Sequence, residues 1–195
     1  MFALQIAFCG LKLDDKAVRV AVGLRLWLDL CVPHLCRNGS PDNARGLLSL
    51  VCKQVSGSSS RHHKLNDLVA RACVAAGVPV DKEPVGLVRQ DGKRPDGLTL
   101  IPFEGGRSLT WNVTFVCTKA DAYIDLAVQG PGCVAEMAAS RKQAKYATLL
   151  QTHFDFQPIA VETLGPTNEW ATSFLYDLAR RISLVSGEDR TSVFV

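Results

Sequence analysis

The chain has 195 residues, with 22 Lys or Arg and 19 Asp or Glu, which gives a formal net charge of +3. A single domain of this length buries roughly two thirds of its unfolded surface, so it does not need disulfides to fold. The seven scattered cysteines favour a reducing compartment. No apolar run reaches the ~18 residues of a membrane span, and the apolar N-terminus lacks the features of a signal peptide. We therefore expect an intracellular protein without a membrane partner.

The first 60 residues show little periodicity. We expect a lead segment over 1–30, with a helix over 15–31, followed by a zinc-knuckle-like segment and linker over 31–60 that ends in "KQVSGSSS". Thiols and imidazoles bind zinc when four of them are well placed. The segment offers four such candidates: Cys31, His34, Cys36 and Cys52. The alternative is a loop without metal.

Regular periodicity begins at Arg61. The pattern predicts, in chain order, a helix over 61–76, a short strand within 78–88, strands over 98–103 and 108–117, a helix over 133–153, a strand over 154–163 and a helix over 168–186. This order, αβββαβα, predicts an α/β (α+β) domain over 61–195 in which helices flank a central mixed sheet. An apolar segment is just beginning where the sequence stops, so we expect the domain to be truncated at its C-terminus.

An amide stands inside the predicted strand over 108–117. Side chains alternate along a strand, so Trp111 and its alternate neighbours face the core, while Thr110 and Asn112 share the other, polar face. Asp96 precedes the partner strand of the hairpin and lies near that polar face if the hairpin pairs. The arrangement is a candidate metal or proton-transfer site, and the alternative is a solvated sheet face.

Two lysines interrupt an apolar stripe of the helix predicted over 133–153. At 100° per residue, Lys142 and Lys145 share a face with Val134, Ala138 and Leu149. One interpretation is that the lysine stems snorkel along the apolar surface. The functional interpretation is that the pair points toward the acid-bearing edge of the sheet.

Positive charge gathers in four short segments, over 60–64, 89–94, 139–145 and 179–181. If these segments converge, they form a surface for a nucleic-acid backbone; otherwise they are separate solvated faces. The candidate nucleic-acid-binding residues are Arg61, His62, Lys64, Arg94 and Arg141.

Five blocks occur in order along the chain: "SRHHKLNDLV", "EPVGLVRQDGKRPDGLTLIPF", "GRSLTWNVTFV", "AASRKQAKY" and "FQPIAVETLGP". With the predicted element order, they resemble the PD-(D/E)xK restriction-endonuclease-like fold. More closely, they resemble the C-terminal region of reverse-transcriptase polyproteins from non-LTR retrotransposons of animal genomes. The resemblance runs from about Leu11 to the last residue.

The resemblance implies metal-dependent phosphodiester cleavage in the nucleus, with Mg²⁺ or Mn²⁺ and no small-molecule cofactor. The implied partner is DNA, with RNA as the alternative. Such cleavage requires carboxylates that hold the metal and a nearby lysine. Asp96 and the residue at position 112 would hold the metal. The full set of implied catalytic residues is Glu83, Asp96, Asn112, Lys142, Lys145 and Tyr146.

The chain departs from this family at two sites. The family block reads "WDVT", whereas this chain has Asn112 in place of the aspartate, so we expect weak metal binding and little cleavage. In the zinc-knuckle pattern, Leu48 stands at a histidine position and Asn38 at a cysteine position, so we expect a degenerate zinc site. The polymerase segment of such polyproteins is absent from the sequence. The alternatives to an impaired endonuclease are a non-catalytic nucleic-acid-binding remnant and a functionless fragment.

Overall fold

The computed structural model describes residues 14–37, 39–51, 56–88, 91–147 and 154–187. The chain divides into two compact units, Met1–Ser59 and Ser60–Val195. Within the described ranges, no helix is both long and apolar enough to cross a membrane.

The first unit contains helix α1 (Asp15–Leu26), the two-residue strands β1 (His34–Leu35) and β2 (Pro41–Asp42), which pair antiparallel, and helix α2 (Leu48–Val51). The carboxylate of Asp14 accepts a hydrogen bond from the Ala17 N–H and caps α1. The helix ends earlier than the range 15–31 predicts, because Trp27 adopts a left-handed conformation with φ 57°.

The second unit contains a four-stranded mixed sheet flanked by helices, and this class of fold is confirmed. Its strand order is β3-β4-β5-β6, with antiparallel pairing except between β5 and β6. The specific restriction-endonuclease-like fold stays a prediction. The elements are α3 (Ser56–Ala75), β3 (Val80–Lys82), η2 (Val85–Leu87), β4 (Gly97–Thr99), β5 (Ser108–Val116), η3 (Asp121–Tyr123), α4 (Ile124–Ala127), α5 (Cys133–Tyr146), β6 (Phe154–Glu162) and α6 (Glu169–Ser186).

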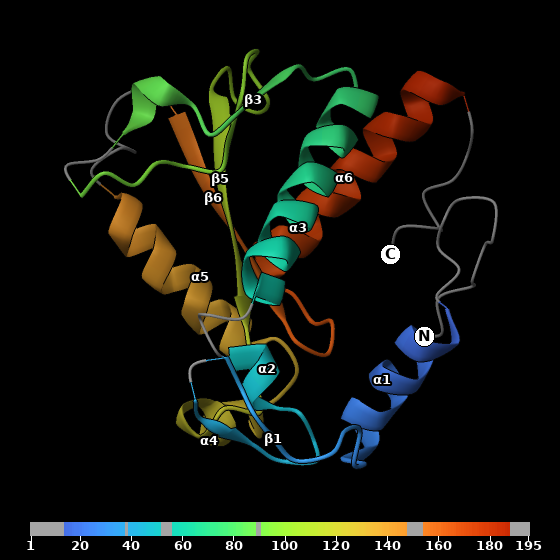
Figure 1. Cartoon of the computed structure of the whole chain (residues 1–195). Coiled ribbons are helices and arrows are strands. Elements are labelled where there is room, and N and C mark those ends of the chain that lie inside the picture. Colours follow the sequence, from blue (N-terminus) through green and yellow to red (C-terminus); the bar gives the residue numbers. More distant parts are fainter. Residues whose placement is uncertain (1–13, 38, 52–55, 89–90, 148–153, 188–195) are drawn as a thin grey trace. The chain divides into compact units, whose positions relative to one another are not determined.

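One face of the sheet carries a large apolar core. Helices α3 and α6 lie together on this side (Figure 1), and β5 contributes Leu109, Trp111 and Val113, each at most 2% exposed. On α6, the rings of Trp170 and Phe174 stack with their centroids 5.2 Å apart. The prediction that alternate residues of this strand face the core is confirmed.

One cysteine belongs to this core. Cys73 of α3 is fully buried, and burial raises the pKa of its thiol to about 12. It therefore stays protonated and packs as a small apolar side chain.

The other face of the sheet is covered by α5 (Figure 1). The contact uses small residues, Ala135, Ala138 and Ala139 of the helix against Ala160 of β6, and small residues let a helix approach a sheet closely. Thr110 and Asn112 of β5 point to this side and are each only 4% exposed. The alternative interpretation, a solvated sheet face, is therefore wrong, because α5 covers the polar side chains.

Helix α5 begins against the end of β6. Its N-cap residue, Gly132, makes no side-chain cap, and the buried carboxylate of Glu162 instead accepts hydrogen bonds from the N–H groups of Val134 and Ala135, at 3.0 and 3.2 Å. A carboxylate at a helix N-terminus satisfies donors that have no partner within the helix and complements the helix dipole. This contact fixes the start of the helix that carries Lys142.

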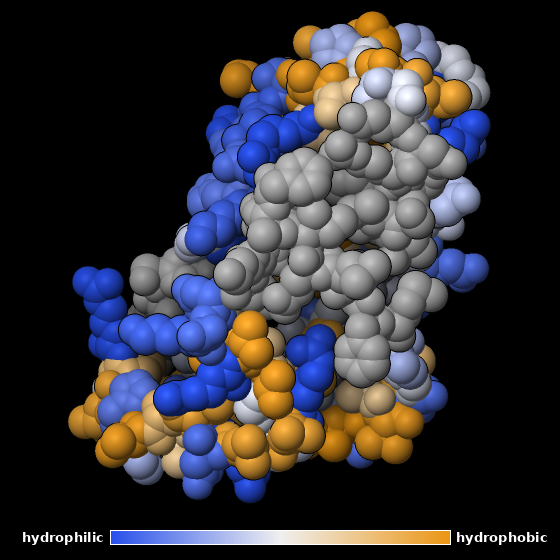
Figure 2. Space-filling model, turned by 90° about the vertical axis from the view of Figure 1, so that its right-hand side faces the viewer, coloured by the Kyte–Doolittle hydropathy of each residue, from blue (hydrophilic) through white to orange (hydrophobic). Residues whose placement is uncertain are grey.

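Apolar side chains remain exposed at the end of the unit where α3 and α6 finish. Figure 2 shows apolar residues gathered at the upper end of the face it draws. Val74 of α3 and Leu184 and Val185 of α6 are between 60% and 73% exposed.

Candidate active site

Asp96 is positioned by the pairing of β4 with β5. Gly97 lies opposite Trp111, and the Asp96 N–H also donates to the Trp111 carbonyl at 2.8 Å, so the residue before β4 is held against β5 at Trp111. A Cβ atom at Gly97 would lie 2.0 Å from the Trp111 ring. Glycine after the aspartate is therefore needed because the indole fills the space of a side chain.

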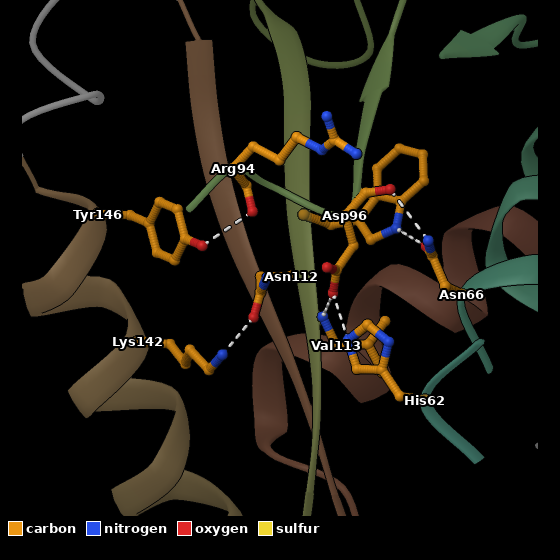
Figure 3. Close-up of polar contacts among 9 residues, drawn as sticks. His62, Asn66, Arg94, Asp96, Asn112, Val113, Lys142 and Tyr146 are labelled. Carbon is orange, nitrogen blue, oxygen red and sulfur yellow. Dashed lines mark hydrogen bonds and ion pairs between the residues drawn. The ribbon is translucent and has the colours of Figure 1, made fainter. Parts of the chain in front are cut away.

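Helix α3 and strand β5 hold the Asp96 carboxylate (Figure 3). Oδ2 of Asp96 accepts from the backbone N–H of Val113 at 2.6 Å and lies 3.0 Å from Nε2 of His62. This hydrogen bond to the carboxylate raises the pKa of His62, against the lowering effect of burial. Asp96 is therefore oriented by two donors from two different elements.

One helical turn beyond His62, Asn66 supports the same residue through the backbone. The Asn66 amide donates to the Asp96 carbonyl at 3.0 Å, and its own Oδ1 accepts from the indole N–H of Trp111 at 2.8 Å. Asn66 is 2% exposed, so the two contacts give both ends of a buried amide a partner.

Asn112 meets Lys142 on the α5 side of the sheet. The Lys142 ammonium donates to Oδ1 of Asn112 at 2.5 Å (Figure 3). Burial lowers the pKa of Lys142, and the charge of Asp96 opposes this effect. The stem of Lys142 does not simply snorkel to solvent, because its ammonium reaches back to the sheet.

Tyr146, at the end of α5, fixes the segment that leads into Asp96. Its hydroxyl donates to the Arg94 carbonyl at 3.0 Å, and its ring stacks on Phe156 with the centroids 4.5 Å apart. Tyr146 is 2% exposed. In this geometry its contacts position the Asp96 segment.

Glu83 and Arg94 form an ion pair at the edge of this site. The Arg94 guanidinium donates to the Glu83 carboxylate and lowers its pKa. Glu83 has a left-handed φ of 53°, which is uncommon for a residue with a side chain, and its N–H donates to the Asp96 carbonyl at 3.0 Å. Glu83 is thus tied to the Asp96 backbone, while its carboxylate is occupied by Arg94.

Lys145 lies farther along α5 and faces other charges. Its ammonium is 3.9 Å from the Asp91 carboxylate, and contact with the Lys93 side chain lowers the pKa of Lys145. Lys142, not Lys145, is the lysine that reaches Asn112.

The remaining candidate nucleic-acid-binding residues are spread over α3 and α5. The Arg61 guanidinium carbon lies 6.0 Å from the centroid of the Phe115 ring, and Lys64 and Arg141 are exposed. Nucleic-acid contact by these residues stays a prediction.

The structure thus places two pairs at neighbouring positions of β5: Asp96 with His62 at Val113, and Asn112 with Lys142. Sequence reasoning placed His62 among nucleic-acid-binding residues and missed both its contact with Asp96 and the role of Asn66. The available signal was their spacing of four residues, which sets two polar side chains on the helix face that also carries the buried Val69, Ala70 and Cys73.

The candidate zinc residues lie in the first unit. The Cys31 thiol donates to the carbonyls of Asn43 and Ala44 at 3.5 and 3.4 Å, and Nδ1 of His34 lies 3.0 Å from the Val32 carbonyl. Cys36 is half-buried, whereas Cys52 lies outside the described residues. Among the residues that the structure describes, no group of three or more His, Cys, Asp or Glu is arranged to hold a metal ion. Zinc binding stays a prediction.

A scan against protein-family models found no match to this chain, and a search of curated proteins found no significant relative.

Proposed function

We propose that residues 61–195 are a metal-dependent DNA endonuclease domain, of the kind found in non-LTR retrotransposon polyproteins, whose cleavage activity is impaired by Asn112. The observation that carries this proposal is that the Asp96 carboxylate accepts from the Val113 N–H while the preceding residue, Asn112, accepts from Lys142. Asp96, Asn112 and Lys142 come from three separate sequence blocks. A carboxylate, a further oxygen ligand and a nearby ammonium are the groups that metal-dependent phosphodiester cleavage requires.

The donor atoms fit a hard divalent cation that keeps most of its waters. Such ions are commonly held by one or two carboxylates together with substrate phosphates, and both the Asp96 carboxylate and the Asn112 carbonyl offer oxygen. When bound, the ion would polarise the phosphate and lower the pKa of a water molecule.

The amide at position 112 weakens this site in two ways. It removes one of the two negative charges on which affinity for a divalent cation strongly depends. In addition, its carbonyl already accepts from the Lys142 ammonium, so a metal would compete with a tethered cation for the same oxygen. An aspartate at this position would instead offer one full negative charge, shared between the metal and the Lys142 ammonium.

Other residues of the chain would orient the substrate and the site. Lys142, half-buried beside Asn112, would stabilise charge that develops on the phosphate. Tyr146 and Asn66 would keep Asp96 in place through the Arg94 and Asp96 carbonyls. These contacts fix the residue directly before β4, which favours precise positioning of its carboxylate.

Plasmid nicking with Mg²⁺ or Mn²⁺ tests the proposal. The assay compares the unaltered chain, Asn112→Asp, and Asp96→Ala in each background. We expect that only Asn112→Asp cuts and that Asp96→Ala abolishes this cutting, because each carboxylate contributes charge to the metal. Cutting by the unaltered chain through Asp96 would mean that Asn112 is a tolerated ligand. Absence of cutting in every variant that is folded by circular dichroism would overturn the proposal.

A second candidate function is nucleic-acid binding without cleavage. The observation that favours it is the concentration of cations beside the site, where Lys93 contacts Lys145 and Lys142 lies nearby. Two neighbouring ammonium groups repel each other, and a phosphate between them would relieve this repulsion. Salt-sensitive DNA binding that survives Asp96→Ala in a chain that never cuts would support this function.

A further inference from the structure

His62 approaches Asp96 from an element that the metal site described so far does not use. It lies on α3, on the side of β5 opposite to Lys142 (Figure 3), and its side chain is 34% exposed. The imidazole is therefore reachable from solvent, although the carboxylate beside it is only 12% exposed.

The distance between the two side chains matches that between neighbouring ligands of a metal ion. Nε2 of His62 lies 3.0 Å from Oδ2 of Asp96. Two adjacent ligands of an octahedral ion, each at about 2.1 Å, lie about 3 Å apart. The carboxylate is already held in place for a cation, because its Oδ2 accepts from the Val113 N–H and the Asp96 backbone carbonyl accepts from Asn66.

The charges around Asn112 favour the His62 side for a cation. The Lys142 ammonium already lies on the carbonyl of Asn112, and it repels a second cation from that oxygen. On the other side, the imidazole of His62 contacts Asp96. In its unprotonated form it is neutral and offers a nitrogen lone pair to a cation.

We infer that His62 and Asp96 are the two protein ligands of the cation, with His62 in place of Asn112, and that the site takes Mn²⁺ in preference to Mg²⁺. The inference rests on the proposed function for the presence of a metal. An imidazole nitrogen suits transition metals, whereas Mg²⁺ prefers oxygen ligands throughout. The substitution at position 112 would thus have changed which metal is bound as well as how tightly.

Mn²⁺ binding to the full chain tests this inference without any cleavage assay. Electron paramagnetic resonance measures the free Mn²⁺, and addition of Mg²⁺ measures the competition between the two ions. For the unaltered chain we expect Mn²⁺ to bind at least about tenfold more tightly than Mg²⁺. His62→Gln should weaken Mn²⁺ binding by about tenfold or more and reduce the preference.

The matched control is His63→Gln, because His63 is the adjacent imidazole and its ring contacts that of His62 at 5.7 Å between centroids. It should leave Mn²⁺ binding unchanged. In the unaltered chain, Mn²⁺ should broaden the nuclear magnetic resonance signals of the His62 ring before those of His63. This readout needs no substitution, so it holds even if His62→Gln folds poorly.

The outcomes separate this inference from the proposed function. Unchanged Mn²⁺ affinity in folded His62→Gln, equal affinity for the two ions, or no Mn²⁺ binding by the unaltered chain would each overturn the inference. If Asn112→Asp nevertheless cuts DNA, the proposed function survives without it. If Mn²⁺ binds through His62 while no variant cuts, the inference survives and the proposed function fails.

Discussion

The two faces of the sheet are packed differently, although the same strands form both. On the α3 and α6 side, Trp111 and its neighbours fill a core of large apolar and aromatic side chains. On the α5 side, the apolar cluster consists of four alanines, and Thr110, Asn112 and Lys142 also lie on this side. The first face supplies most of the apolar burial, while the second holds polar groups where a helix lies close to the sheet.

The difference suggests how stability and chemistry are divided in this fold. Small residues bring the helix backbone close enough for a lysine to reach the sheet, but they bury little apolar area. Substitutions in the apolar core of the first face should therefore mainly affect folding, and those of Asn112 and Lys142 on the second face should mainly affect binding or cleavage.

The largest expected effect is that of Trp111→Ala. Truncation of a fully buried tryptophan costs about 3–5 kcal/mol of unfolding free energy, and here it also leaves Oδ1 of Asn66 without the indole N–H. Urea denaturation measures the loss. The matched control is Thr110→Val, one residue earlier on the α5 side, which removes one hydrogen bond to the Asp155 carbonyl and should cost only about 1 kcal/mol. Equal losses would contradict the comparison.

Gly97→Ala should have an intermediate effect. The added methyl group would lie 2.0 Å from the Trp111 ring, so the indole or the strand must move, at a cost of about 1–3 kcal/mol. The control is Gly86→Ala in η2, where no atom lies within 4 Å of the added Cβ. Thermal unfolding should separate the two variants clearly; a Gly97→Ala chain as stable as the control would mean that Trp111 does not fix this register.

The smallest effect on stability is expected for Lys142→Met. The variant loses the hydrogen bond to Asn112 but no longer buries an ammonium, which already has a lowered pKa, so the net loss should be about 1 kcal/mol or less. In the Asn112→Asp background the same substitution should abolish plasmid nicking. A large loss of stability would show that Lys142 contributes mainly to folding. Continued nicking would show that it is not needed for cleavage.

Much of the second unit is predictable from local patterns. The alternation of side chains gave β5 to within one residue, and Gly187 marks the end of α6 as expected. Strand β4 is shorter than the predicted range 98–103, because the Thr99 hydroxyl accepts from the Leu109 N–H and donates to the Ile101 carbonyl. A side chain thus replaces the backbone ladder there, which periodicity does not reveal.

The site was predictable only in part. Asp96, Asn112 and Lys142 come together through strand register and one helix face, both of which can be inferred from spacing. The contact between His62 and Asp96 depends on how α3 is rotated against the sheet, and the ion pair of Lys145 with Asp91 depends on the path of a loop. Neither the rotation of α3 nor the path of the loop can be inferred from a local sequence pattern.

The attachment of α5 at both ends has a consequence for how the helix opens. Glu162 holds its first N–H groups, and Tyr146 ties its last turn to the strand-leading segment at Arg94. A helix that packs mainly through alanine would otherwise fray from its termini. With both ends fastened to the sheet, its amide hydrogens should exchange with solvent together, in a single cooperative opening that also releases the segment before Asp96.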